Sequence, residues 1–357
     1  MERTVERLLG GVRVVERMDL GSSDLAPVAR LFLDRSYDGI GRTVIAKGRR
    51  LTDVGWGRGS EFLRNERLAL DHLRGTGLAP VFLASSVDEP APHHEQVVVL
   101  TDLGPGPTVQ ELLFGDDPMA ATEGLLAMAR LAGALHGTVD PEFAAAHEVQ
   151  FLDHPLDLWR PLTEAAAELG FPPPGDVELA DLAGELRRHT TFTHGDFTPN
   201  NVVLVDGEAR LVDLEGAGRR HPGMDAACLR LPFPQYGHWA VLPDHVLARM
   251  DRAYRAALAP MEDSAYERMM ATGCAAWAIV RASRLRLIAS TDQDSVEAVR
   301  RRTQIVQTLT SAAVSAMAVY PRLCTWFEEL AGAMQLRWEE TRQPPRGFQA
   351  FKDFPNQ

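Results

Sequence analysis

Lysine is almost missing from this chain. Of its 37 lysine and arginine residues, only Lys47 and Lys352 are lysines, and all the others are arginine. Such a bias indicates a GC-rich genome. A lysine that persists against it is a candidate for a role that suits a compact ammonium group and not the planar fork of arginine.

Cysteines and long apolar segments are also scarce. Cys228, Cys274 and Cys324 are too widely spaced to form a metal motif or a disulfide framework. The longest apolar runs, such as Cys274–Val280, are far too short to cross a bilayer, and the first residues lack the apolar core of a secretory signal. We therefore expect a reduced, cytoplasmic protein without a membrane segment.

Basic residues are outnumbered. The chain carries 49 acidic residues against 37 basic ones, a formal net charge of -12. This balance argues against a general nucleic-acid or anionic-membrane binder, and it is compatible with a cationic ligand without identifying one. With 45% hydrophobic residues in 357, the chain has enough apolar material for one large domain or two packed lobes.

The first hundred residues favour β-structure. Residues Val28–Leu33 and Thr43–Lys47 are rich in strand formers, and Asp38-Gly39 between them is typical of a tight hairpin turn. A further apolar strand is predicted over Gln96–Leu100.

One helix interrupts these strands. Ser60 is its expected N-cap, and apolar residues follow at helical spacing, among them Phe62 and Leu70. Glu66 falls on the same stripe. A carboxylate there either lies at the edge of the stripe in solvent or is buried with a positively charged partner, and the helix alone leaves both alternatives open.

A glycine- and proline-rich segment after Leu103 marks a domain boundary, which divides the chain into residues 1–103 and 104–357. Beyond it the pattern is mainly helical. We expect helices over 122–139, 243–258, 262–290, 292–319 and 321–341.

The chemistry is concentrated in a short β-rich stretch. Val202–Val205 and Ala209–Val212 read as two strands joined by an Asp206-Gly207 turn. Because a tight hairpin brings its open ends together, Asn201 is expected near Asp213, and their oxygen atoms suit Mg²⁺.

Asp196 lies on the loop that leads into this hairpin. An aspartate, an asparagine five residues later and a second aspartate after a hairpin form a pattern typical of phosphoryl transfer. In such a site the first aspartate accepts the proton of a substrate hydroxyl, and the other two residues hold Mg²⁺ on the nucleotide phosphates.

The segments HGDFTPNN, LVDLEGAG and GMDAA, in this order, resemble the aminoglycoside phosphotransferase and choline kinase-like family. The resemblance implies an α+β, two-lobed, protein kinase-like fold, with a small β-rich N-lobe and a larger, mainly helical C-lobe. It also implies ATP or GTP as co-substrate, Mg²⁺ as cofactor and a small-molecule hydroxyl as acceptor.

The resemblance also implies roles for individual residues. In the C-terminal part these are Asp196 as catalytic base, Asn201 and Asp213 as metal ligands, His194 as support of the catalytic loop and Asp225 as a structural anchor. In the N-terminal part they are Lys47 on the phosphates, Glu66 as its helix partner, Gly21, Ser22 and Ser23 in the loop over the nucleotide, and Thr101 and Leu103 at the hinge against the base.

The chain departs from the family pattern in two places. The nucleotide loop has a single glycine, and the second metal motif reads DLEG, in which Glu215 is a further candidate for metal or substrate binding.

The leading hypothesis is a kinase of an aminoglycoside or another antibiotic or natural product. The alternatives are a metabolic kinase of choline, homoserine or sugar type, and a non-catalytic nucleotide-binding regulator on the same fold. A protein kinase is disfavoured because HGD replaces HRD.

Overall fold

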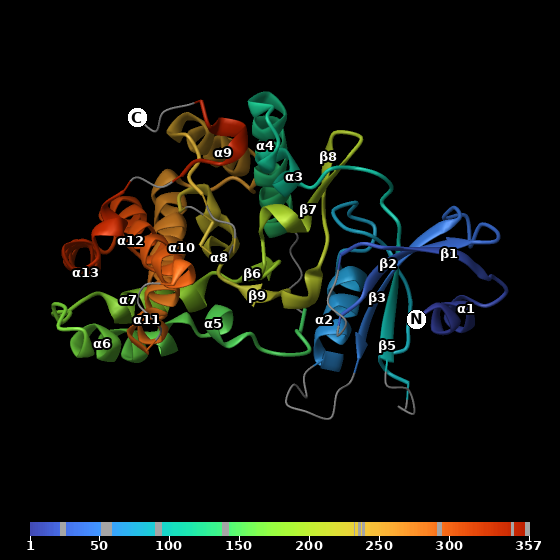
Figure 1. Cartoon of the computed structure of the whole chain (residues 1–357), viewed down its shortest axis with the longest axis horizontal. Helices are drawn as coiled ribbons and strands as arrows, with labels where there is room; N and C mark the ends of the chain where they lie inside the picture. The colour runs from blue at the N-terminus through green and yellow to red at the C-terminus, as the bar shows by residue number, and fades with distance from the viewer. Residues whose placement is uncertain are drawn as a thin grey trace. The chain divides into compact units, whose positions relative to one another are not determined.

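The computed structural model describes residues 1–21, 26–50, 59–89, 95–137, 143–231, 233–234, 237, 240–290, 295–343 and 346–353. It consists of two compact units (Figure 1). The first unit comprises Met1–Pro107, Glu142–Glu148 and Asn201–Gly218, and the second unit comprises the remainder. In the part of the chain that is described, no helix has the length and apolar character needed to cross a membrane.

An antiparallel sheet forms the centre of the first unit. Its described strands, in the order β1-β2-β3-β5-β4, are β1 (Val14–Asp19), β2 (Val28–Leu33), β3 (Thr43–Arg50), β5 (Glu95–Thr101) and β4 (Phe82–Ser85). Lys47 on β3 lies opposite Val28 on one side and Val98 on the other. It therefore occupies a central strand of the sheet.

Two helices cover opposite faces of this sheet (Figure 1). Helix α1 (Glu2–Leu9) packs on a core that includes Val44 and Ala46. Because side chains alternate along a strand, residues 45, 47 and 49 of β3 point to the other face, where α2 (Gly59–His72) packs. This alternation directs Lys47 towards α2.

A returning hairpin completes the first unit. Strands β7 (Val202–Val205) and β8 (Glu208–Leu211) are joined by Asp206 and Gly207, both with positive φ (51° and 81°), as a tight turn requires. Backbone hydrogen bonds attach the hairpin to the rest of the unit, one to the carbonyl of Pro107 and one to that of Leu78. The short helix η3 (Leu214–Gly216) follows β8 and packs against α2.

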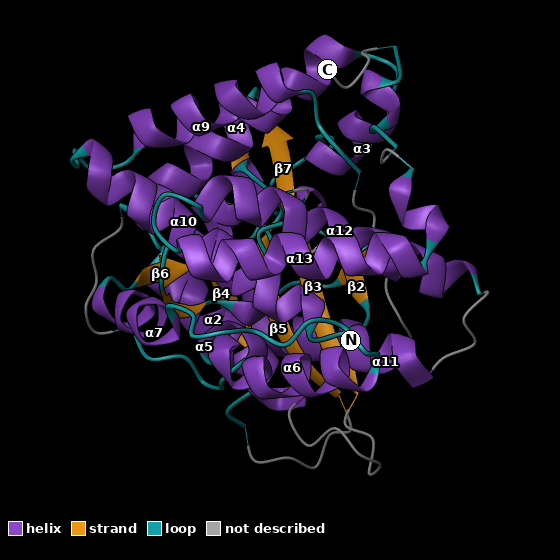
Figure 2. Ribbon diagram, turned by 90° about the vertical axis from the view of Figure 1, so that its left-hand side faces the viewer, coloured by secondary structure: helices purple, strands orange, loops and turns teal. Residues whose placement is uncertain are grey.

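The second unit is mainly helical. Its described α-helices are α3 (Val109–Phe114), α4 (Pro118–His136), α5 (Gln150–Asp153), α6 (Trp159–Glu168), α7 (Leu179–Arg188), α8 (Gly223–Ala226), α9 (Asp244–Ala257), α10 (Asp263–Ala282), α11 (Leu285–Ser290), α12 (Val296–Ala316) and α13 (Pro321–Arg337). Helices α10, α12 and α13 pack side by side (Figure 2). They enclose a large apolar core that contains Trp277 and Phe327.

Two glycines allow a close crossing within this unit. A Cβ atom added to Gly273 of α10 would lie 2.1 Å from the carbonyl oxygen of Gly223 in α8. The contact brings α8 directly onto α10, and Trp277 reinforces it by donating its indole N–H to the carbonyl of Met224 at 2.6 Å. Nearby in the chain, β6 (Thr191–Thr193) pairs with β9 (Gly218–Arg220).

The expected α+β class is confirmed, and several boundaries differ from those predicted. Strand β1 precedes the strand that was expected to be the first, so the segment after Gly21 connects β1 to β2. Helix α2 begins at Gly59, so Ser60 is not its N-cap. The helix expected over 262–290 is two helices, because the hydroxyl of Ser283 donates to the carbonyl of Val280 and competes with the regular helix bonds.

Candidate functional site

Lys47 stands at the centre of an ionic cluster in the first unit. Its Nζ lies 2.8 Å from Oε1 of Glu66 and also donates a hydrogen bond to Oδ1 of Asp213. The Glu66 side chain is 1% exposed. The alternative in which this glutamate lies in solvent is therefore wrong, and the buried alternative, with a cationic partner, is the one that the structure contains.

The charges of this cluster depend on one another. Burial acts to lower the pKa of Lys47, but the carboxylates of Glu66, Asp213 and Glu215 outweigh it and raise that pKa. Burial raises the pKa of Glu66, while the Lys47 ammonium opposes the shift. Lys47 is thus held in its charged form at neutral pH.

A second ion pair runs beside the first. Nη2 of Arg49 lies 2.6 Å from Oε2 of Glu215, and the Arg49 guanidinium stacks over the Phe62 ring at 5.1 Å. Arg49 follows Lys47 by two residues on one face of β3, and Glu215 follows Asp213 by two. Strand β3 therefore holds the segment after β8 through two neighbouring pairs.

Asn65, next to Glu66 on α2, joins three parts of the first unit. Its side-chain amide donates to the carbonyls of Glu215 and Ala217 at 2.9 and 2.8 Å. Its Oδ1 accepts a hydrogen bond from the backbone N–H of Ala146 at 2.8 Å. The residue is 0% exposed, so these bonds satisfy a fully buried amide and fix α2 against the segment that carries Asp213.

Asn201 and Asp213 lie at the open ends of the hairpin, as the sequence pattern predicts for the strands. The backbone N–H of Val212 donates to the Asn201 carbonyl at 3.0 Å, and Asp213 follows in a left-handed backbone conformation (φ 64°, ψ 56°). The Asn201 amide and Asp213 carboxylate are oxygen donors of the type that Mg²⁺ prefers. Among the described residues no cluster of three or more His, Cys, Asp or Glu could hold a metal.

In the second unit, Asp225 anchors the HGD loop. Its carboxylate accepts hydrogen bonds from the backbone N–H groups of His194 at 2.6 Å and Gly195 at 3.1 Å. Burial acts to raise the pKa of Asp225, but the hydrogen bond from His136 and the other polar contacts lower it overall. A buried, ionised carboxylate thus fixes the backbone directly before Asp196.

The anchor extends to two helices. His136 at the end of α4 contacts Asp225 Oδ2 with its Nε2 at 3.5 Å, and its Nδ1 lies 2.8 Å from the hydroxyl of Tyr254 on α9. His194, fully buried, accepts a hydrogen bond at Nδ1 from the backbone N–H of Asp196 at 3.2 Å. His194 thereby shapes the turn in which the Asp196 side chain remains partly exposed.

The remaining predicted residues belong neither to the ionic cluster around Lys47 nor to the contacts of Asp225, or they lie outside the described residues. Gly21 is exposed with φ 75°, and Ser22 and Ser23 lie outside the described residues. Thr101, the last residue of β5, accepts a hydrogen bond at Oγ1 from the Val81 N–H at 2.9 Å. Leu103 follows it and is half-buried.

Arg49, Asn65, His136 and Tyr254 were not identified from the sequence. Arg49 carried a signal, because a base two residues beyond Lys47 on a strand shares its face. Asn65 carried a weaker one, as a polar residue next to Glu66 in an apolar helix. The contact of His136 with Tyr254 joins residues 118 positions apart and had no local signal.

Comparison with known proteins identifies the family to which the chain belongs. Residues 55–271 match the model of the phosphotransferase enzyme family APH. No curated protein matches the chain at a significant level.

Three solved structures are similar over most of the chain. An amicoumacin kinase in complex with AMP-PNP and Ca²⁺ is 15% identical with a TM-score of 0.57, over 85% of this chain and 92% of that one. A putative aminoglycoside phosphotransferase from Ralstonia eutropha is 15% identical with a TM-score of 0.53, over 93% and 97%. A choline kinase from Cryptosporidium parvum is 13% identical with a TM-score of 0.53, over 93% and 98%.

At such identities these likenesses show the fold, which is protein kinase-like as expected. The family match shows more, because it spans more than half of the chain and includes the HGD loop, the hairpin and both aspartates after it. The chain belongs to the phosphotransferase enzyme family.

Proposed function

We propose that this protein transfers the γ-phosphoryl group of ATP or GTP to a hydroxyl of an antibiotic or related natural product, with aminoglycosides as the first acceptors to test. The observation that carries the proposal is the ionic cluster of Lys47, Glu66 and Asp213, in which Glu66 is buried and Asp213 remains partly exposed. It joins a phosphate-binding cation, the carboxylate that orients it and a candidate metal ligand within one compact unit.

In the proposed mechanism Lys47 binds the nucleotide phosphates, and Glu66 keeps its ammonium in position. Asn201 and Asp213 would hold Mg²⁺, with Glu215 as a further oxygen donor once it leaves Arg49. When bound, Mg²⁺ neutralises charge on the phosphates. Residues 1–103 then serve as the nucleotide-binding lobe, with Gly21, Ser22 and Ser23 over the phosphates and Thr101 and Leu103 beside the base.

Asp196 is the proposed catalytic base, in the lobe of residues 104–357. It would accept the proton of the acceptor hydroxyl as the oxygen attacks the γ-phosphorus. His194 and Asp225 act as positioning residues, since they fix the backbone on both sides of Gly195. Such positioning is what phosphoryl transfer requires of a protein.

The test is a phosphorylation screen read by mass gain, over aminoglycosides, other natural products, choline and amino-alcohols. Wild type should add one phosphoryl group to a member of the antibiotic set, and Asp196→Asn should not, while it still binds nucleotide. Asp206→Asn, at the tip of the hairpin, is the matched control and should keep full activity. Transfer by Asp196→Asn at the normal rate would disprove the assignment of the base.

The same screen separates the alternatives. Phosphorylation of choline, homoserine or a sugar alone would identify a metabolic kinase. Nucleotide binding without transfer to any acceptor would favour a regulatory protein.

A further inference from the structure

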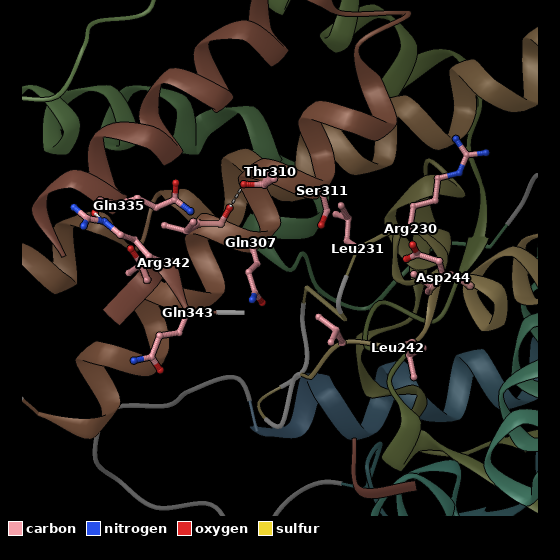
Figure 3. A pocket seen from close by; sticks show the side chains of 14 residues that line it. Arg230, Leu231, Leu242, Asp244, Gln307, Thr310, Ser311, Gln335, Arg342 and Gln343 are labelled. Carbon is pink, nitrogen blue, oxygen red and sulfur yellow. Dashed lines mark hydrogen bonds between the residues drawn. The ribbon is translucent and has the colours of Figure 1, made fainter. Parts of the chain in front are cut away.

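A cavity of about 370 Å³ lies within the second unit, in the range of small-molecule sites (Figure 3). Helix α12 forms one wall, and described residues from 230–231, 241–247 and 335–343 supply the others. The predicted phosphoryl-transfer residues are not among its described lining residues.

The described walls combine two kinds of side chain. One kind is uncharged and carries hydrogen-bonding groups: Gln307, Thr310, Ser311, Gln335, Thr341 and Gln343. The other kind is apolar and includes Leu231, Leu242 and Val306. A ligand that matches these walls combines hydrogen-bonding groups with a carbon skeleton.

Gln307 carries the argument furthest. Both polar atoms of its side-chain amide are buried, and neither has a hydrogen-bond partner among the described residues. Figure 3 shows this side chain extending from α12 into the cavity. Burying an amide without a partner is costly, so its retention points to a ligand that supplies the missing bonds.

Charge in the described lining is nearly balanced. Arg230 is bound by both carboxylate oxygens of Glu267, at 2.8 and 2.9 Å, and by Asp251 at 3.3 Å. Asp244 supplies the carboxylate among the described lining residues, and the positive charge of Arg342 balances its negative charge. The described lining residues therefore include no acidic cluster of the kind that a polycation would need.

We propose that this cavity binds an uncharged small molecule bearing hydroxyl or amide groups, and that Gln307 selects it. Such a molecule is either the phosphoryl acceptor or a ligand that is not phosphorylated. The inference that this cavity is the acceptor site rests on the proposed function. The inference that it binds an uncharged small molecule does not.

Ligand-observed NMR on the full chain, without nucleotide, tests binding separately from catalysis. The probes are a fragment set of neutral alcohols and amides with matched amines, including N-acetyl-D-glucosamine and D-glucosamine. The variants are Gln307→Leu, Gln307→Glu and, as matched control, Gln150→Leu, which removes an exposed amide bonded to Asp157.

Neutral probes should bind wild type and the control. Gln307→Leu should weaken them about tenfold, as expected for the loss of hydrogen bonds to one amide. Gln307→Glu should shift preference to the amines. Gln307→Leu should keep or raise Tm, because it removes an amide without a partner, and this result separates ligand selection from a structural role.

Absence of any neutral probe whose binding depends on Gln307, or equal binding of matched amines by wild type, would overturn the proposal. Bound probes are then incubated with Mg²⁺ and ATP. Mass gain identifies the cavity as the acceptor site, and binding without mass gain identifies a separate ligand site; both results keep the proposal. Failure of phosphorylation alone bears on the proposed function and leaves the NMR result intact.

Discussion

The side-chain amide of Asn65 donates a hydrogen bond to the main-chain carbonyl of Glu215 at 2.9 Å. Through this bond and its partner at Ala217, helix α2 holds the segment that begins with Asp213. The residue after Asn65 is Glu66, the partner of Lys47. One helix turn therefore fixes both the carboxylate that orients Lys47 and the backbone beside the candidate metal ligand.

Asn65→Leu should lower the free energy of unfolding by about 2–4 kcal/mol, because it leaves buried carbonyls and one N–H without partners. It should also raise the Mg²⁺ concentration needed for half-maximal transfer, since Asp213 loses its fixed position. Urea denaturation and an Mg²⁺ titration measure the two effects.

Thr272→Val is the control for this variant. It removes a buried hydrogen bond to Tyr320 in the second unit, and it should cost stability without moving the Mg²⁺ requirement. An equal rise in the Mg²⁺ requirement of both variants would mean that Asn65 affects transfer only through the stability of the fold.

Lys47→Met should destabilise the fold by about 3–5 kcal/mol, because it leaves Glu66 buried without its counter-charge. The double variant Lys47→Met/Glu66→Leu should recover most of that loss while remaining inactive. Urea denaturation of the single and double variants gives the coupling free energy. Equal stability of Lys47→Met and wild type would contradict a strong buried pair.

Asp225→Asn keeps the shape of the side chain and removes its charge. The backbone N–H groups of His194 and Gly195 bond to different oxygens of this carboxylate. The Asn amide can accept from only one of them and turns its NH2 group to the other, so we expect a loss of about 2–3 kcal/mol in unfolding free energy. Turnover should fall more than nucleotide affinity does. Calorimetry measures the change in stability, and a comparison of kcat with KM measures the change in turnover. A change confined to KM would contradict the role of Asp225 in anchoring the HGD loop.

Stability should fall as the solution becomes acidic. Burial, aided by His189 and His136, lowers the pKa of His221 to about 3, and its Nδ1 accepts the Gly223 N–H at 3.2 Å. The unfolded chain therefore takes up a proton near its ordinary pKa of 6.5 that the folded chain refuses. Between pH 7.5 and pH 5 this one group should remove about 2 kcal/mol.

His221→Asn can still accept the Gly223 N–H and does not titrate in this range. This variant should lose about 2 kcal/mol less unfolding free energy than wild type between pH 7.5 and pH 5. Urea denaturation at several pH values measures the difference. An unchanged slope would show that His221 is protonated in the folded state.

Gly273→Ala should destabilise by about 1–3 kcal/mol or more, because the new methyl group meets the Gly223 carbonyl. Gly332→Ala, on α13 with open space around it, should be neutral or stabilising by up to about 1 kcal/mol. Thermal unfolding of both variants tests the crossing of α8 and α10, and similar Tm values would contradict it.

The sequence predicted the elements with strong local signals. Strand β2 matches its predicted limits because Val28–Leu33 is a mainly apolar run between Pro27 and Asp34, and the hairpin of β7 and β8 follows from its Asp-Gly turn. Strand β1 was missed because its residues Val14–Asp19 are mainly exposed and polar at an edge of the sheet. Edge strands carry little of the apolar pattern from which strands are recognised.

For the candidate site, the types of the residues and their order could be predicted from the sequence, whereas their contacts could not. Glu66 on its own helix was ambiguous, because only the position of Lys47 on β3 decides whether it is buried. The pair of Arg49 and Glu215 spans 166 positions, and no local pattern encodes such a separation. The cavity around Gln307 is likewise formed by segments that meet only in the folded chain.

The scarcity of lysine has a spectroscopic consequence. Lys352 is half-exposed on the surface, 2.8 Å from Asp116, whereas Lys47 is enclosed by carboxylates. A sample enriched in isotope at lysine alone would give two side-chain resonances from very different surroundings. One of them would report directly on the ionic cluster, without a mutation or an attached label.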